Sequence, residues 1–323
     1  MGASAKVNAF FGVMTMVIAV PTGVKIFNWL FTMYGGRVRF TVPILWTIGF
    51  MVTFVLGGLT GVLMAVPPVD WQVHNSLFLI AHFHHVIIPG VVFGVFAAYN
   101  YWFPKAFGFT LDERWGKASF WCWFVGFHVA FMPLYVLGLL GMTRRMQHYD
   151  NLAWQPWLLV ATAGAVIILA GIVCQAVQLV VSIRTRDQRR DLTGDPWNGR
   201  TLEWSTASPP PAWNFAVLPQ VAGKDAFWAR KQRARTEPDQ LAPDREYRPI
   251  ELPKNSPVGF VTAFFAVVGG FALIWHIWWL AALGVLGAFV ATLFFAFRNK
   301  DENEIPPEQL VRFDRGHPAG VAL

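Results

Sequence analysis

The amino-acid sequence predicts an all-α membrane protein, a bundle of about seven transmembrane helices. Of its 323 residues, 55% are hydrophobic and only 14% are charged, well below the roughly one quarter that is typical of soluble domains. The apolar residues also gather in runs of roughly 20 or more, which is the length that an α-helix needs to cross a bilayer. The expected spans are Val7–Tyr34, Thr41–Val66, Ser76–Phe103, Lys117–Leu140, Trp157–Ile183, Val258–Trp275 and Ile277–Phe297.

These spans divide the chain into four parts. Residues 1–183 hold the first five spans, and residues 184–255 form a polar connection, rich in Pro and Arg, that we expect to be extended on the surface. Residues 256–298 form a C-terminal transmembrane hairpin. Its joint, Trp275–Trp279, suits the membrane interface, where we also expect His276. Residues 299–323 form a short charged tail.

The distribution of basic residues argues against a nucleic-acid-binding face. Although the formal net charge is +7, Lys and Arg gather in alternate loops between the apolar runs, as in cytoplasmic membrane loops. We therefore expect the 184–255 connection and the C-terminus in the cytoplasm. Cys122 and Cys174 lie inside apolar runs, and we expect no disulfide between them. Because Met1–Lys6 lead directly into the first span, we also expect no secretory signal peptide.

Three imidazoles lie in the middle of the third expected span, at His82, His84 and His85. Ionisable groups at that depth are costly and usually face the interior of a helix bundle. Each helical residue advances by about 100°, so His82 and His84 point to nearly opposite sides of one helix and could hold two metal centres. His85 lies about 60° from His82 and need not be a ligand. The alternative is a set of hydrogen-bonded histidines that only pack helices together.

A second candidate cluster lies on the outer side of the membrane. Arg144 and Arg145 break the expected charge bias there, which indicates either a chance surface pair or a bound anion. Asp70 and His74 lie in another loop on this side. Arginine binds carboxylates through two parallel hydrogen bonds. Haem would explain both clusters, because its iron takes imidazole ligands and its two propionates suit arginine.

Lys25 is a charged residue inside the first expected span, and Thr22 lies three residues earlier on the same helix face. A lysine at such a position indicates an ion or proton route. The alternative is that its long side chain extends to the nearby cytoplasmic interface. The residues alone leave both interpretations open.

Several segments resemble subunit I of the haem–copper terminal oxidases, and most closely the bo-type ubiquinol oxidases. They are IAVPTGVKIFNW at 18–29, AHFH at 81–84, GMTRR at 141–145, GDPWNGRTLEW at 194–204 and IWHIWWL at 274–280. The resemblance covers nearly the whole chain. It implies that residues 1–183 are the C-terminal part of the oxidase core and that the terminal hairpin belongs to the quinol-oxidising branch.

The resemblance also implies roles for the residues described above. His82 is similar to the proximal ligand of the high-spin haem, where O₂ is reduced. His84 is similar to one axial ligand of the low-spin haem that supplies electrons. Lys25 and Thr22 match the proton-uptake channel. Arg144 and Arg145, expected on the outer side, match the pair that holds haem propionates. Asp70 and His74, on the same side, match the pair beside the high-spin haem propionates and a divalent-cation site.

The chain departs from the family pattern in three respects. His85 replaces another residue and receives no ligand role, and Pro89 replaces a small residue and is expected to bend the helix about a turn past the ligands. The family's copper ligands and the second axial ligand of the low-spin haem would precede Met1. We therefore expect the C-terminal half of a subunit I, from a split gene or a truncated one, and no reduction of oxygen by the isolated chain.

In the complete enzyme, the resemblance implies reduction of O₂ to water by ubiquinol in an aerobic respiratory chain, coupled to proton translocation across a bacterial plasma membrane. The implied cofactors are haem b, haem o and, with the N-terminal half, copper. The implied partners are that half and subunits II, III and IV. Three alternatives stay open: a cytochrome c oxidase subunit I, which would carry haem a; a haem-free ion transporter or channel; and a degenerate fragment that binds nothing.

Overall fold

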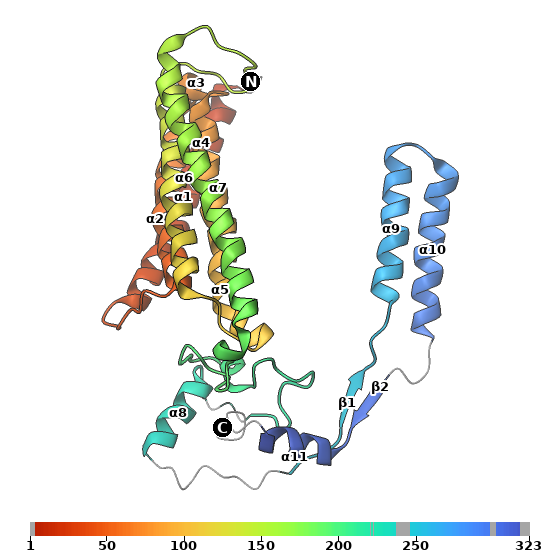
Figure 1. Cartoon of the computed structure of the whole chain (residues 1–323). Helices are drawn as coiled ribbons and strands as arrows, with labels where there is room; N and C mark the ends of the chain where they lie inside the picture. The colour runs from red at the N-terminus through yellow and green to blue at the C-terminus, as the bar shows by residue number, and fades with distance from the viewer. Residues whose placement is uncertain (1–3, 220, 222, 237–245, 298–301, 317–323) are drawn as a thin grey trace. The chain divides into compact units, whose positions relative to one another are not determined.

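The computed structural model describes residues 4–219, 221, 223–236, 246–297 and 302–316, and the chain separates into two units, Met1–Pro196 and Trp197–Leu323. The first unit is helical (Figure 1). Its helices are α1 (Ala5–Met33), α2 (Val42–Met64), α3 (Pro67–Val73), α4 (Leu77–Ile87), α5 (Gly94–Phe107), α6 (Glu113–Leu139) and α7 (Gln155–Arg184). A π-helical turn, Ile88–Phe93, joins α4 to α5, and 3₁₀ turns lie at Leu152–Trp154 and Arg186–Arg189.

The second unit combines short polar elements with a helical hairpin. It contains a 3₁₀ turn (Leu202–Ser205), α8 (Ala226–Thr236), β1 (Ile250–Pro253), α9 (Val258–Ile274), α10 (Trp278–Ala296), β2 (Glu302–Ile305) and α11 (Pro307–Gly316). Strands β1 and β2 pair antiparallel, with Ile250 opposite Ile305, and so join the two ends of the α9–α10 hairpin. A helical hairpin therefore lies where the C-terminal transmembrane hairpin was expected, and its place in a membrane stays a prediction. Residues 298–301 and 317–323 of the expected tail lie outside the described residues.

The 184–255 connection is not extended throughout, contrary to expectation. The 3₁₀ turn at Leu202–Ser205 packs against α8, and the side chains of Trp204 and Phe227 are both buried. An indole and a phenyl ring bury a large apolar area, which orders a segment whose Pro and Arg content predicted an open loop. Residues 237–245 of this connection are outside the described part of the chain.

Within the described ranges, six helices are long and apolar enough to cross a membrane. They are α1, α2, the continuous run from α4 to α5, α6, the run Leu152–Arg184 and α10. The sixth expected span, α9, is apolar but has only 17 residues, or about 25 Å of helix at 1.5 Å per residue. The all-α membrane fold is confirmed, with six such helices and one shorter apolar helix.

Two helix boundaries differ from the expected spans by four residues. The third span was expected to end at Phe103, but α5 continues through Pro104 and Lys105 to Phe107, where Gly108 ends it with φ 77°. Lys105 was expected in a loop, yet it is buried and its ammonium group donates to the carbonyl of Gly194 at 2.8 Å. The fourth span was expected to begin at Lys117, and α6 begins four residues earlier, at Glu113.

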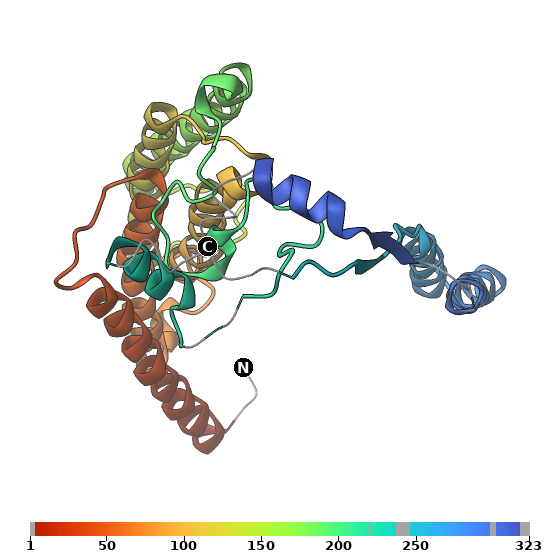
Figure 2. The same ribbon diagram turned by 90° about the horizontal axis from the view of Figure 1, so that it is seen from below.

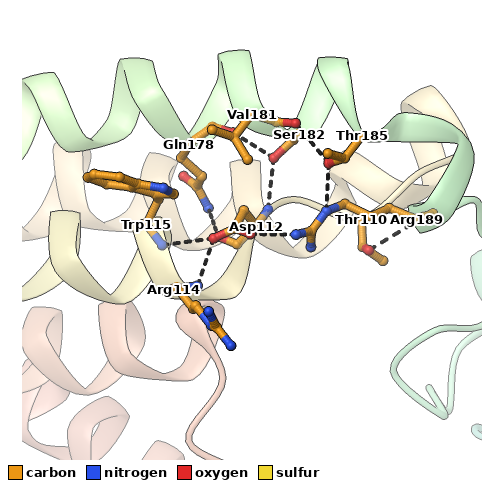
Figure 3. Close-up of polar contacts among 9 residues, drawn as sticks. All are labelled: Thr110, Asp112, Arg114, Trp115, Gln178, Val181, Ser182, Thr185 and Arg189. Carbon is orange, nitrogen blue, oxygen red and sulfur yellow. Dashed lines mark hydrogen bonds and ion pairs between the residues drawn. The ribbon is translucent and has the colours of Figure 1, made fainter.

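Asp112 explains the early start of α6, because it caps the helix (Figure 3). Its Oδ1 accepts hydrogen bonds from the backbone N–H groups of Arg114 and Trp115 at 3.0 and 2.9 Å, which would otherwise lack partners at a helix start. Its other carboxylate oxygen pairs with Arg189, and Gln178 of α7 donates to its backbone carbonyl at 3.1 Å. These contacts fasten the ends of α6 and α7 to each other.

The core of the first unit centres on Trp46 of α2. Its ring meets Phe93, Phe96 and Phe120 edge-on, with ring centroids 5.1, 4.9 and 5.2 Å apart. Such edge-to-face pairs are a favoured packing of aromatic rings. In contrast, α1 has no buried residue and lies at the edge of the first unit (Figure 2). The core therefore forms around α2, α4, α5 and α6.

Candidate functional site

Helix α4 carries the three imidazoles and packs against α2 and α6. It begins at Leu77 and is capped by Ser76, whose hydroxyl accepts a hydrogen bond from the backbone N–H of Phe78 at 3.2 Å. It gives way to the π-helical turn at Ile88–Phe93, which contains Pro89. Proline cannot donate a backbone hydrogen bond, so a wider turn here is consistent with the expected local distortion after the histidines.

The imidazole of His82 is held by α2. Its Nδ1 lies 3.0 Å from the carbonyl oxygen of Gly57 and 3.0 Å from the hydroxyl of Thr60. A carbonyl can only accept, so Nδ1 carries the proton and Nε2 keeps the lone pair that a metal needs. Gly61 leaves room for the ring, because a Cβ there would lie 2.8 Å from Cε1 of His82. The hydroxyl of Tyr135 on α6 lies 3.0 Å from that of Thr60.

His84 is held differently, by its own helix and by aromatic rings. Its Nδ1 lies 2.7 Å from the carbonyl oxygen of Ile80, which again leaves Nε2 as the free lone pair. The ring stacks on Phe83, with centroids 4.5 Å apart at 28°, and on Phe131 of α6, at 4.4 Å and 23°. His82 and His84 therefore contact different neighbouring helices, which agrees with the rotation expected along one helix.

His85 is fully buried against α6. Its Nδ1 bonds to the carbonyl of Ala81 at 2.8 Å, and its Nε2 is buried without a hydrogen-bond partner among the described residues. Its ring contacts four side chains of α6: Phe127, His128, Phe131 and Tyr135. This packing gives His85 a structural place between helices, and the expectation that it is not a ligand stays a prediction.

Sequence reasoning missed His128, whose ring centroid lies 5.9 Å from that of His85. Its Nδ1 bonds to the carbonyl of Phe124 at 2.8 Å, and its Nε2 lies 3.5 Å from the hydroxyl of Thr53. The criterion that singled out His82 could have found it, since His128 is also an ionisable residue in the middle of an apolar run. No comparable signal in the sequence pointed to Thr60 and Tyr135, whose hydroxyls form the hydrogen-bonded chain that reaches His82.

The residues expected on the outer side of the membrane lie near the start of α4. The backbone N–H of Leu77 donates to the carbonyl of Met142 at 3.0 Å, and that of Arg144 donates to the carbonyl of Asn75 at 2.9 Å. These two backbone hydrogen bonds hold the loop that carries Arg144 and Arg145 beside α4, the helix that carries the histidines. The Nε of Arg144 is buried without a hydrogen-bond partner in the described part of the chain, while Arg145 is exposed, with φ 68°.

Asp70 lies in α3, the helix before α4, and its carboxylate is 3.4 Å from Nδ1 of His74. Asp70 also lines a pocket between α1 and the α2–α3 corner, together with Asn8, Thr15 and Trp71. The expected Asp70–His74 pair is therefore in contact. Its role beside a haem or a cation stays a prediction.

Lys25 and Thr22 are not brought to the histidines. Both lie on α1, where Thr22 donates from its hydroxyl to the carbonyl of Ile18 at 3.0 Å and Lys25 is exposed. The proton route through Lys25 and Thr22 thus stays a prediction.

His276 lies at the joint of α9 and α10, with φ 58°. Its side chain is exposed and contacts Trp278 edge-on. Its expected place at the membrane interface stays a prediction.

Comparison with known proteins identifies the family. The family model described as "Cytochrome C and Quinol oxidase polypeptide I" matches residues 1–167, just over half of the chain. The chain belongs to this family. It is 62% identical to "Probable cytochrome c oxidase subunit 1" of Bradyrhizobium diazoefficiens and 54% identical to "Ubiquinol oxidase subunit 1" of Acetobacter aceti. Each alignment covers 98% of this chain and 47% or 48% of the relative.

The chain therefore spans about half the length of the curated relatives that it matches. Among solved structures, it is similar to a chain of a haem–copper terminal oxidase dimer, at 18% identity and a TM-score of 0.49, over 56% of this chain and 37% of the other. The expected family, subunit I of a haem–copper terminal oxidase, is confirmed. The relatives' names divide between cytochrome c and quinol oxidases.

The family implies haem and copper, and the residues of α4 fit haem. Both His82 and His84 have Nδ1 occupied by a backbone carbonyl and Nε2 free for iron. The buried, unpartnered Nε of Arg144 suits an anionic propionate. For copper, the described residues contain no group of three or more His, Cys, Asp or Glu side chains arranged to hold a metal ion. The expectation that the copper ligands lie outside this chain stays a prediction.

Proposed function

We propose that this chain is the haem-ligating C-terminal half of subunit I of a proton-pumping ubiquinol oxidase that reduces O₂ to water. The observation that carries the proposal is the pair His82 and His84, two residues apart on α4, each with Nδ1 held by a backbone carbonyl. Such second-partner bonds orient imidazoles and raise their basicity as metal ligands. Haem iron, when bound, supplies one-electron transfer and oxygen chemistry.

In this proposal the two histidines serve different haems. His82, fixed on α2 by Gly57 and Thr60, ligates the high-spin haem, and His84, stacked on Phe83 and Phe131, ligates the low-spin haem. Phe83 lies between the two ligands in sequence and separates them on the helix.

The outer-side residues neutralise the haem carboxylates. Arg144 and Arg145 hold propionates through charge-assisted hydrogen bonds, and the loop that carries them is fastened to the start of α4. Asp70 and His74 lie beside the high-spin haem propionates and a divalent-cation site.

Lys25 carries protons toward the oxygen-reducing haem, and the hydroxyl of Thr22 lies on the same helix face. A lysine inside an apolar span indicates an ion or proton route, which suits this role. The alternative, a haem-free transporter that uses Lys25 and the histidines, lacks the fit that the two oriented imidazoles give to haem iron.

The electron donor we propose is ubiquinol, and cytochrome c is the second candidate. The relative from Acetobacter aceti is named as a ubiquinol oxidase and aligns over 98% of the chain. The relative from Bradyrhizobium diazoefficiens, named as a probable cytochrome c oxidase, aligns equally far, so the α9–α10 hairpin does not separate the two names.

The remaining parts of the active enzyme come from outside this chain in our proposal. The N-terminal half of subunit I would supply the copper ligands and the second ligand of the low-spin haem iron, and subunits II, III and IV would complete the complex. We place it in the bacterial plasma membrane with haems b and o, and we expect the isolated chain not to reduce oxygen.

A visible difference spectrum with a pyridine haemochrome assay tests this proposal. Membranes that contain this chain, with and without an N-terminal half, are compared. Haem bands that require both halves support a site completed by two parts of subunit I, and haem bands from this chain alone show that its histidines bind haem unaided. No haem in either sample would refute the oxidase role. Oxygen uptake with ubiquinol and with reduced cytochrome c then identifies the donor.

A further inference from the structure

We propose that Phe131 of α6 is a positioning residue that sets the plane of the His84 imidazole, and through it the electronic state of the low-spin haem. This inference rests on the proposed function, in which His84 ligates that haem. It adds a residue on a neighbouring helix, far from the histidine pair in sequence.

The geometry confines the His84 ring. Phe83 and Phe131 both lie nearly parallel to the imidazole, at 28° and 23°, with centroids 4.5 and 4.4 Å away. Two phenyl rings at these distances would collide if they shared one face, so the imidazole lies between them. Rotation about its Cβ–Cγ bond would drive the ring edge into one phenyl or the other. The bond from Nδ1 to the carbonyl of Ile80 opposes the same rotation.

Phe131 is itself held in place. It packs on Phe127, one helical turn earlier, with ring centroids 4.7 Å apart, and Phe127 is fully buried. Both rings contact His85, the neighbour of His84, which is fully buried against α6. The aromatic face of α6 therefore fixes the rotation of α4 through His85 and the ring plane of His84 through Phe131.

The plane of an axial imidazole matters because it determines how the ligand's π orbital overlaps the iron d orbitals. That overlap sets the g-values of a low-spin ferric haem and contributes to its reduction potential. Groups around a metal ligand that fix its orientation tune the metal in this way. Phe131 acts through His84 and makes no bond to iron in this proposal.

The test uses the assembled oxidase complex that contains this chain, with electron paramagnetic resonance spectra of the oxidised enzyme and a redox titration of the low-spin haem. Phe131→Leu removes the flat face, and Phe131→Met does so with a flexible side chain that refills the space. We expect both to shift the largest low-spin g-value and the midpoint potential. Phe131→Tyr keeps the flat face and should restore the wild-type values.

Phe124→Leu is the matched control, because it makes the same change on the same helix at a ring that stacks on Phe120 and not on His84. It should leave both readouts unchanged. Unaltered g-values and potential in Phe131→Leu and Phe131→Met would overturn the proposal, as would failure of both variants to assemble while Phe124→Leu assembles, because Phe131 would then be purely structural. Absence of a low-spin haem signal in the wild-type complex would instead refute the proposed function.

Discussion

Helices α4 and α1 are both apolar and both carry ionisable side chains, yet they are built in opposite ways. On α4, His82 is bonded to α2, His84 is stacked against α6, and His85 is fully buried. On α1, no residue is buried and Lys25 is exposed. Packing within this chain therefore sets the orientation of the three histidine side chains. The described residues do not hold the side chain of Lys25 in a fixed orientation. Substitutions in the two helices should affect different properties.

The largest expected effect is on α4. His84→Ala should abolish the low-spin haem bands, and His82→Ala should abolish the high-spin ones, because each substitution removes the imidazole that we propose as the iron ligand, and the neighbouring His85 is buried against α6. Haem content and optical difference spectra of the complex measure this. His276→Ala is the control, since His276 lies at the α9–α10 joint, and it should retain both haems. Normal spectra in His82→Ala and His84→Ala would contradict the assignment of the ligands.

Lys25→Met should have the second largest effect and should sharpen the contrast between the helices. The haem spectra should be unchanged, because Lys25 contacts none of the three histidines. Oxygen consumption should fall by about 10²-fold or more, the usual scale for loss of a positioned proton-transfer group. A stopped-flow or oxygen-electrode measurement in the complex tests it. If Lys25 only reaches toward the interface, Lys25→Met will keep wild-type turnover.

Asp112→Ala tests whether the packing that orients α4 depends on the fastening at the ends of α6 and α7. The substitution removes a helix cap and leaves Arg189 without its carboxylate, so we expect a loss of about 3 kcal/mol of stability. Thermal unfolding in mild detergent measures it. The control is Asp187→Ala, whose partner Arg190 and whose own side chain are both mostly exposed. It should cost about 0.5 kcal/mol or less.

The helical spans could be predicted from the sequence because each is a long apolar run, and runs of that length have few alternatives in a membrane protein. Their ends were harder. The cap at Asp112 depends on Arg189, which is 77 residues away, and the expected loop residue Lys105 is buried because it reaches the carbonyl of Gly194. Local polarity does not reveal partners at that separation.

The candidate site, like the helices, has one part that the sequence predicts and another that depends on residues far away in the chain. The opposite directions of His82 and His84 follow from helical rotation alone, and the sequence predicts them. The groups that hold these rings, Thr60, Tyr135 and Phe131, lie on other helices and become neighbours only through the packing of α2 and α6 on α4. A hydroxyl or phenyl group in an apolar run carries no signal of its own, since most such residues simply pack.

The smallest expected effect distinguishes the two groups that hold His82. Thr60→Val removes a hydroxyl that bridges His82 and Tyr135 but keeps the shape of the side chain, and the Gly57 carbonyl still fixes Nδ1. We expect a loss of about 1 kcal/mol, the net value of a typical hydrogen bond, with the high-spin haem retained. Gly61→Ala should disturb that haem's spectrum more, because the added methyl would lie 2.8 Å from Cε1 of His82 and displace the ring. Thermal unfolding and the high-spin absorption band measure the two effects, and loss of the high-spin haem in Thr60→Val would show that the hydroxyl, and not the carbonyl, orients this ligand.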